Sequence, residues 1–233
     1  MSRIVQAFLN LIFPPMCLAC DGVLLYNESD LCSDCLVSLP PFDLSIDVQR
    51  QSLLDKFYGL IPFRNFFTMY YFSKKGRVQQ LLHKLKYSYQ PEAIIRLGHF
   101  LATNFDLGDY EGIDIIVPVP LYKRRHRVRG YNQSALLAAG ISQVIDKPVV
   151  TDILIRDVPT KTQTGKSRQE RWDSMHDVFT LNPLSKAIIK GKDILLVDDL
   201  VTTGATLAAC AQVLLKRGVA SLSMATLAVA NKE

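Results

Sequence analysis

The sequence lacks the two features that by composition alone would indicate a membrane protein or a strongly basic nucleic-acid binder. The apolar stretch "IVQAFLNLIF" near the amino terminus is too short to cross a bilayer, and it ends at Pro14 and Pro15. Charge of one sign is not in large excess, because 27 lysines and arginines face 22 acidic residues. The first segment also lacks a convincing cleavage site, so we expect a cytoplasmic protein with no transmembrane segment, whose first helix docks on its own body rather than on a membrane or partner.

Cysteine is scarce, yet four of the five cysteines form two C-x-x-C pairs, "CLAC" and "CSDC". Each pair turns tightly enough to aim two sulfurs at one ion, and two such pairs supply the four thiolates that structural zinc prefers. Disulfides are the alternative, and a reducing compartment disfavours them. The sequence therefore predicts a structural Zn²⁺ site with four ligands, Cys17, Cys20, Cys32 and Cys35. Cys210 lies in an apolar helical stretch and is expected in the core.

Internal repeats and low-complexity segments are also absent, and strand-like and helix-like segments alternate after "LPPFDLS". The strand-like segments have apolar interiors, as in "IDIIVPVP", "DILLV" and "SLSMATLAVA". This alternation predicts an α/β fold with a mostly parallel sheet flanked by helices. We expect an amino-terminal helix and zinc module over residues 1–45 and the α/β domain over residues 46–233.

A nucleotide-binding P-loop is missing its first glycine. Gly165, Lys166 and Ser167 match the end of the motif G-x-x-x-x-G-K-[ST], but Thr160 takes the place of the first glycine. A β-branched residue resists the turn that this position requires. The following segment, "RQERWDSMHDVF", is too polar for the buried helix of a P-loop. The sequence therefore argues against an ATPase.

Phosphate chemistry is better supported by "ILLVDDLVTTGATL". We expect residues 194–197 to form a short buried strand with Asp198 and Asp199 at its carboxyl end, the edge where open α/β sheets bind ligands. The small-residue turn Thr202–Thr206 then leads into a helix, whose N–H groups suit a phosphate monoester. Two carboxylates beside a phosphate site can hold the vicinal hydroxyls of a ribose, directly or through a metal. Helix capping alone is the other interpretation of the acids.

This segment resembles the phosphoribosyl-pyrophosphate (PRPP) signature of type I phosphoribosyltransferases. Other segments, in the same order, are similar to the ComF (GntX-like) family, and the similarity extends over nearly the whole chain: "LIFPPMCLAC", "LKY", "VPVPL", "RGYNQS" and "LLVDDLVTTGATL". The resemblance implies a bacterial cytoplasmic protein with an amino-terminal zinc module and a phosphoribosyltransferase domain. It also implies an association with natural competence and DNA uptake.

The same resemblance implies roles for individual residues. Asp198 and Asp199 would hold the ribose hydroxyls of PRPP, which binds with Mg²⁺, and Arg129 would join them in catalysis. The cradle for the 5-phosphate would comprise Thr202, Thr203, Gly204, Ala205 and Thr206. The loop facing the pyrophosphate would supply Lys123, Arg124, Arg127 and Arg129. A mobile flap would reach the substrate with Lys161, Gln163, Lys166, Arg168 and Arg171.

Two classes of function remain open. The first is an enzyme that transfers phosphoribose to an acceptor that no residue identifies. The second is a non-catalytic module that senses PRPP or a nucleotide and grips single-stranded DNA within the competence machinery. The basic run 122–131 favours a pyrophosphate loop, but Tyr122 and Tyr131 at its ends also offer a stacking platform for bases. The sequence leaves the oligomeric state open.

Overall fold

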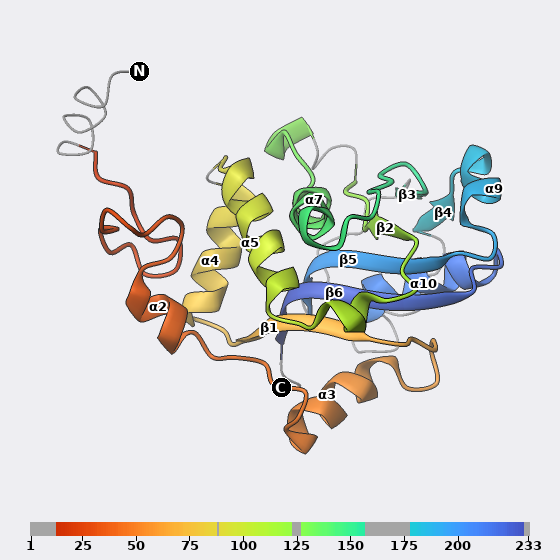
Figure 1. Cartoon of the computed structure of the whole chain (residues 1–233), viewed down its shortest axis with the longest axis horizontal. Coiled ribbons are helices and arrows are strands. Elements are labelled where there is room, and N and C mark those ends of the chain that lie inside the picture. The colour runs from red at the N-terminus through yellow and green to blue at the C-terminus, as the bar shows by residue number, and fades with distance from the viewer. Residues whose placement is uncertain (1–12, 88, 123–126, 157–177, 231–233) are drawn as a thin grey trace.

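A four-stranded parallel sheet forms the centre of the protein (Figure 1). The computed structural model describes residues 13–87, 89–122, 127–156 and 178–230. In sheet order, the strands are β1 (Phe66–Phe72), β6 (Ser221–Ala230), β5 (Asp193–Val201) and β2 (Ile115–Pro118). Every neighbouring pair runs parallel, which confirms the expected α/β class. Parallel strands bury both faces, and this explains their continuous apolar runs.

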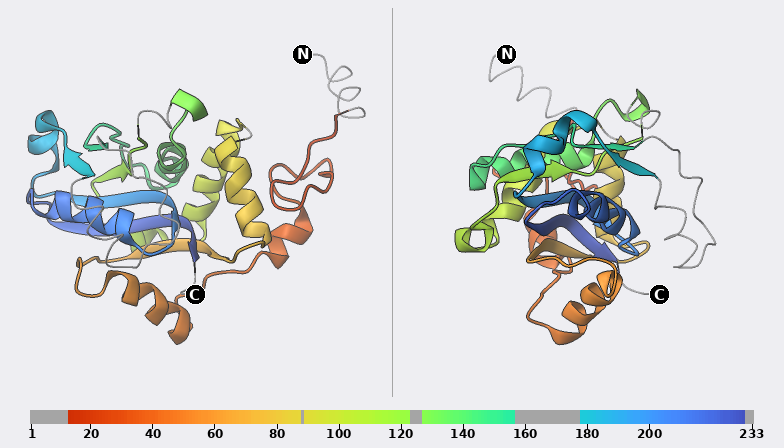
Figure 2. Two further views of the ribbon diagram at one scale, coloured as in Figure 1. Left: turned by 180° about the vertical axis from the view of Figure 1, so that it is seen from behind. Right: turned by 90° about the vertical axis from the view of Figure 1, so that its right-hand side faces the viewer.

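Two layers of helices cover the sheet, one on each face (Figure 2). The first layer contains α4 (Arg77–Tyr87), α5 (Pro91–Thr103) and α7 (Gln133–Ile145). The second contains α3 (Asp47–Phe57) and α10 (Ala205–Leu215). Along β5, successive side chains enter opposite layers: Leu195 packs in the first core and Leu196 in the second. The predicted core residue Cys210 is fully buried in the second layer.

The remaining elements are short. They are α2 (Ser33–Ser38), η1 (Leu107–Tyr110), β3 (Leu154–Arg156), β4 (Phe179–Leu181), η2 (Pro183–Ser185) and α9 (Lys186–Ile189). The strand-like segment "DILIR" does not join the parallel sheet and contributes β3 to a two-stranded antiparallel sheet with β4. Residues 148–150 already occupy the free edge of β2, through hydrogen bonds on both sides of Ile116. No position beside β2 is left for β3.

Strand β5 is longer than the expected residues 194–197. It continues to Val201 because the long strand β6 pairs with it as far as Val229. On the other side, β2 ends at Pro118, opposite Val197. Asp198 and Asp199 therefore lie in the part of β5 that pairs with β6 on one side. On the other side β2 has already ended, so this part of β5 has no neighbouring strand there. The ligand edge that the sequence predicted is this open half of β5.

Several expectations fall on residues that the structure does not describe. These are the amino-terminal helix before Phe13, the flap with the false P-loop within 157–177, and the loop residues Lys123 and Arg124. Within the described ranges, no helix has both the length and the apolar character needed to cross a membrane. The division at residue 45 remains a prediction. Next to it, the Tyr71 N–H donates to the Pro40 carbonyl at 2.8 Å, so the connecting segment runs along the sheet edge.

Candidate functional site

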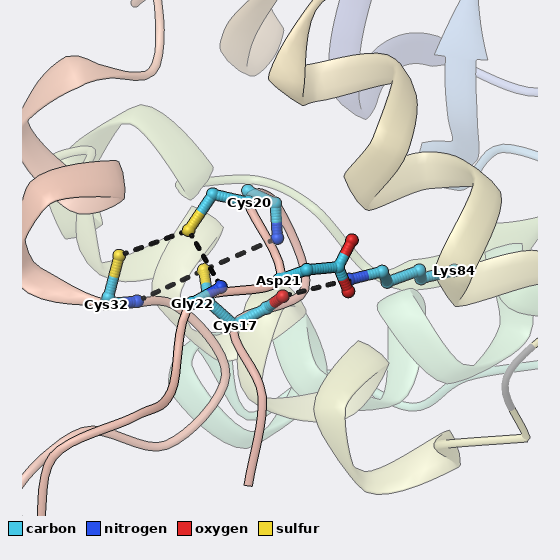
Figure 3. A network of polar contacts seen from close by, with 7 residues as sticks. Cys17, Cys20, Asp21, Gly22, Cys32 and Lys84 are labelled. Atoms are coloured by element: carbon cyan, nitrogen blue, oxygen red, sulfur yellow. Dashed lines mark hydrogen bonds and ion pairs between the residues drawn. The ribbon is translucent and has the colours of Figure 1, made fainter.

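The four paired cysteines converge on one point. All four sulfur atoms lie within 4.8 Å of one another. Figure 3 shows Cys17, Cys20 and Cys32, and Cys20 Sγ lies 3.7 Å from Cys32 Sγ. Thiolates placed tetrahedrally at a zinc–sulfur distance of about 2.3 Å would be about 3.8 Å apart. The spacing of these sulfurs therefore fits a zinc ion, and the cluster can hold a metal. With four protein ligands, such a site would have no open position for a substrate.

Backbone N–H groups support the sulfurs. Cys17 Sγ accepts hydrogen bonds from the amides of Ala19 and Cys32, and Cys20 Sγ accepts one from Gly22, all at 3.4 Å. Burial raises the pKa of Cys17, but the N–H groups of Cys32, Ala19 and Cys20 outweigh it and bring the pKa down to about 7. These turns thus favour the thiolate form of Cys17, which is the form that metals bind, whereas burial and the neighbouring sulfurs raise the pKa of Cys35.

The surrounding segment, residues 15–39, is here called the cysteine module, and polar contacts attach it to the first helix layer. On α4, Lys84 Nζ donates to the Cys17 carbonyl at 3.0 Å and pairs with Asp21 (Figure 3). On α5, Arg96 forms two hydrogen bonds of 2.7 Å with Asp30. Planar pairing of this kind fixes orientation as well as distance. The module is therefore held against the two helices that also cover the sheet.

The acidic pair lies at the open half of β5, where three elements meet. Asp198 is buried, and its Oδ1 accepts hydrogen bonds from Ser134 Oγ of α7 at 3.0 Å and from the Asp199 N–H at 2.9 Å. Asp199 Oδ2 lies 2.5 Å from Lys86 Nζ at the end of α4. The structure therefore brings the predicted acids together with two residues, Ser134 and Lys86, to which the sequence analysis gave no role.

The two carboxyl groups have different electrostatic surroundings. Burial and the neighbouring Asp199 carboxylate raise the pKa of Asp198 to about 7. Burial also acts to raise the pKa of Asp199, but the Lys86 ammonium outweighs it and holds that pKa below its usual range. One acid is thus ionised and paired near neutral pH, while the other is close to its midpoint.

The turn after β5 has the backbone that a phosphate site needs. Gly204 has φ of +82° and is the N-cap residue of α10, and the first N–H groups of this 11-residue helix have no acceptor within the helix. A Cβ atom at Gly204 would lie 3.1 Å from Phe57 Cε1 and 3.2 Å from the Lys56 carbonyl oxygen. A small hollow opens here, lined by Asp198 and residues 200–207. The predicted threonines, Thr202, Thr203 and Thr206, all border it.

Helix α3 contacts this turn through a hydrogen bond, and the sequence analysis did not predict the contact. Lys56 is buried, and its Nζ donates to the Thr202 carbonyl at 2.7 Å. The helix carries a weakly amphipathic sequence, "DVQRQSLLDKF", and precedes the turn by more than 140 residues. Nothing local in the sequence connects the two segments.

The "RGYNQS" segment connects α4 and β2 to the acidic pair. Asn132 caps α7 by accepting the Ser134 N–H, and its Nδ2 donates to the Val119 carbonyl just beyond β2. Tyr131 is buried, and its hydroxyl donates to the Leu85 carbonyl at 2.8 Å. The expectation that Tyr131 offers a stacking platform is therefore wrong, because its ring is part of the core.

Arg129 lies near the acids without pairing with them in this structure. Its guanidinium lies 5.3 Å from the centre of the Tyr87 ring, and its Nη1 donates to Gln133 Oε1 at 3.2 Å. Arg127 is exposed. Gln163, the predicted flap residue, lies outside the described residues, as do the other flap candidates. The roles of these residues toward a ligand remain predictions.

Similarity to characterised families agrees with this geometry. Residues 132–233 match the phosphoribosyl transferase domain family, which includes the acidic pair and the turn. Competence protein F of Haemophilus influenzae is 38% identical over 111 residues, covering 48% of each chain. The DNA utilization protein YhgH of Escherichia coli K12 is 33% identical over 153 residues, covering 62% of this chain and 63% of that protein. Competence protein ComFC of Bacillus subtilis is 37% identical over 48% of this chain and 43% of its own.

Solved structures with similar folds include two enzymes of phosphoribosyl chemistry. Glutamine PRPP amidotransferase from Bacillus subtilis aligns with a TM-score of 0.42 and 18% identity, over 61% of this chain and 30% of that one. A hypoxanthine phosphoribosyltransferase from Staphylococcus aureus aligns with a TM-score of 0.40 and 22% identity, over 60% and 65%. The matched regions span 43% to 63% of the three relatives named above. The domain match and the sequence relatives confirm the expected resemblance: part of the chain is similar to a phosphoribosyl transferase domain and to proteins named for competence and DNA utilisation.

Proposed function

We propose that the chain binds PRPP with Mg²⁺ at the open half of β5 and serves in competence or DNA utilisation. The observation that carries this proposal is that Asp198 lines the same hollow as the Gly204 turn and the start of α10, with Asp199 next to it in β5. Carboxylates suit the ribose hydroxyls or a hydrated Mg²⁺, and the turn suits the 5-phosphate. The names of the relatives supply the biological setting.

The site also suits the chemistry of phosphoribosyl transfer. When pyrophosphate leaves C1 of the ribose, positive charge grows on the sugar and negative charge on the leaving group. Buried carboxylates beside the sugar and cations such as Arg129 beside the leaving group would stabilise these charges. Mg²⁺, when bound, would supply further positive charge at the pyrophosphate. The acceptor is unidentified, so transfer is proposed as a reaction class only.

Calorimetry with PRPP and Mg²⁺ tests the binding site. Replacing both Asp198 and Asp199 with Asn preserves shape and removes two acceptors of charged hydrogen bonds. Each such bond is worth about 1.5–3 kcal/mol, so affinity should fall roughly ten- to a hundredfold per residue. Asp193→Asn, at the opposite end of the same strand, is the matched control and should bind as wild type does. If the double variant binds PRPP as tightly as wild type does, the two acids have a structural role and the PRPP site lies elsewhere.

Turnover distinguishes an enzyme from a sensor. An enzyme should release pyrophosphate from PRPP when the right acceptor is present in a panel of bases, amines and amides. A sensor should bind PRPP with no acceptor-dependent release.

Single-stranded DNA binding is the second candidate, and an exposed aromatic pair favours it. Tyr87 and Tyr89 are 60% and 71% exposed, and Arg129 lies over the first ring. Aromatic faces beside basic side chains bind unpaired bases and their backbone. Oligonucleotide affinity should fall steeply with salt, and Tyr87→Ala should weaken it. Salt-independent or absent binding would remove this candidate.

Two further assignments accompany the proposal. The four cysteines would hold a structural Zn²⁺, as the sulfur spacing and the N–H donors support. A cytoplasmic location would suit these thiols, because a reducing compartment leaves them available to a metal. Zinc content after purification tests the first assignment, and cell fractionation tests the second.

A further inference from the structure

Lys86, in the last turn of α4, lies directly beside the acidic pair. Its Nζ lies 2.5 Å from Asp199 Oδ2, and both side chains are largely covered, at 24% and 19% exposed. Lys86 precedes the segment matched by the phosphoribosyl transferase domain family, which begins at residue 132. The lysine of this ion pair therefore comes from α4, which lies outside the matched segment, whereas Asp199 lies within it.

The backbone on both sides of Lys86 is anchored. The carbonyl of Leu85 accepts the Tyr131 hydroxyl at 2.8 Å, and the Tyr87 ring lies under the Arg129 guanidinium. The lysine is also in the last turn of α4, where no further helical turn covers it. A long, flexible ammonium side chain on a fixed base can change partners without moving the helix.

The ion pair has a consequence for any ligand that uses the Asp199 carboxylate. A ribose diol or a metal-bound diol at Asp199 must compete with an ammonium group that already neutralises it. Breaking a largely covered pair is costly unless the released charge finds a new partner. The neighbouring Arg129 shows that the same side of the site carries a second cation. A phosphate group arriving there would offer the new partner.

We infer that Lys86 is a specificity-determining residue of this site: it covers Asp199 in the free protein and moves to the 1-pyrophosphate when a ligand carries one. The inference rests on the proposed PRPP function. A ligand with both a ribose diol and a pyrophosphate at C1 displaces Lys86 and then binds it. Ribose 5-phosphate displaces it and offers no replacement partner. The chain therefore favours the activated sugar over its hydrolysis product.

The test compares PRPP with ribose 5-phosphate, each with Mg²⁺, on the full chain. Lys86→Met keeps the length of the side chain and removes its charge, whereas Lys86→Arg keeps the charge. Lys192→Met is the matched control, because it removes another lysine–aspartate pair, 3.1 Å from Asp114, at the opposite end of the sheet. Calorimetry gives the PRPP affinity, and competition against bound PRPP gives that of ribose 5-phosphate. Thermal melts establish that each variant is folded.

The expected changes have opposite signs. In Lys86→Met the PRPP affinity should fall about tenfold or more, as for loss of a charged hydrogen bond. Ribose 5-phosphate should bind as well as or better than to wild type, because nothing competes for Asp199. Lys86→Arg should retain most of the preference for PRPP, and Lys192→Met should change neither affinity.

Three results would overturn the inference. Parallel loss of both ligands in Lys86→Met would make the lysine a purely structural support of the acids. Unchanged PRPP affinity in Lys86→Met would show that the pyrophosphate does not use this lysine. Failure of wild type to bind PRPP would remove the proposed function together with the inference, whereas the first two results would leave PRPP binding standing.

Discussion

The cysteine module and the sheet are stabilised by different interactions. The sheet buries apolar strands between two helix layers, and side chains such as Leu195 and Leu196 have no exposed surface. The module has one regular element, the six-residue α2, which is too short to be stable alone. Its segments are joined by single hydrogen bonds, by ion pairs to α4 and α5, and by the four converging sulfurs. From this comparison we expect the cysteine module to depend on a bound metal, and the sheet to depend on apolar burial.

The largest effect should follow loss of one sulfur. Cys32→Ser should release the metal and unfold the cysteine module while the sheet persists, because structural zinc binding contributes about 10–16 kcal/mol in small sites. Elemental analysis and hydrogen exchange measure the two consequences. Cys210→Ser is the control: it disturbs the sheet's core and should retain the metal. Metal-free wild-type protein with an ordered module would contradict the comparison.

A substitution at the turn should damage the sheet region alone. Gly204→Ala forces a side chain into a left-handed conformation and against Phe57 and Lys56, which should cost about 1–3 kcal/mol and weaken PRPP binding. Gly218 has nearly the same φ, +83°, with no atom within 4 Å of an added Cβ. Gly218→Ala should therefore show the backbone cost without the contact cost. Denaturant unfolding of the two variants separates these two costs. Equal losses in the free energy of unfolding would mean that α3 shifts to make room for the new side chain.

The junction between the two regions should respond to the Arg96–Asp30 pair. Asp30 is mostly buried and Arg96 is half exposed, so solvent screening limits the cost of Arg96→Met to about 1 kcal/mol. The change should raise protease cleavage within the module and leave the sheet's unfolding midpoint nearly unaltered. Arg50→Met removes an exposed pair with Asp47 and should have almost no effect on either. Identical behaviour of the two variants would show that the junction does not depend on this pair.

The acidic pair should make the stability of the sheet region depend on pH. Burial raises the pKa of Asp198 to about 7, whereas an unfolded aspartate titrates near 4. The folded protein thus holds a proton that the unfolded chain loses between these values, so stability falls as pH rises from about 4 to about 7. Asp198→Asn removes this loss, and its melting temperature relative to wild type should increase between pH 5 and pH 8. A constant difference would place the pKa of Asp198 in the ordinary range.

The smallest expected effect is at the false P-loop. Lys166→Ala should leave any ATP hydrolysis by the purified protein unchanged, because phosphate binding is assigned to the turn after β5 and not to Gly165–Ser167. A phosphate-release assay measures this. If wild type hydrolyses ATP and the substitution abolishes this activity, the segment around Lys166 is a nucleotide site after all.

Local patterns were sufficient to predict most of the fold and part of the site. Continuous apolar runs predicted β2, β5 and β6, and the paired cysteines predicted one cluster of sulfurs. The acid pair and the small-residue turn lie together at the end of a strand, as predicted, because strand, turn and helix follow one another directly in the chain. Ligand binding at this edge stays a prediction. Tyr131 was misassigned, since an aromatic residue in a basic run has the same sequence appearance whether it is exposed or buried.

The sequence by itself determined the metal-binding pattern, the parallel sheet and the position of the acids along the chain, because each depends on neighbouring residues. Only the tertiary structure decided which cations meet those acids. Lys86 reaches Asp199 from α4, and Lys56 reaches the Thr202 carbonyl from α3. These contacts join residues more than 100 positions apart, and the physical reason for them is the packing of the two helix layers against opposite faces of one sheet.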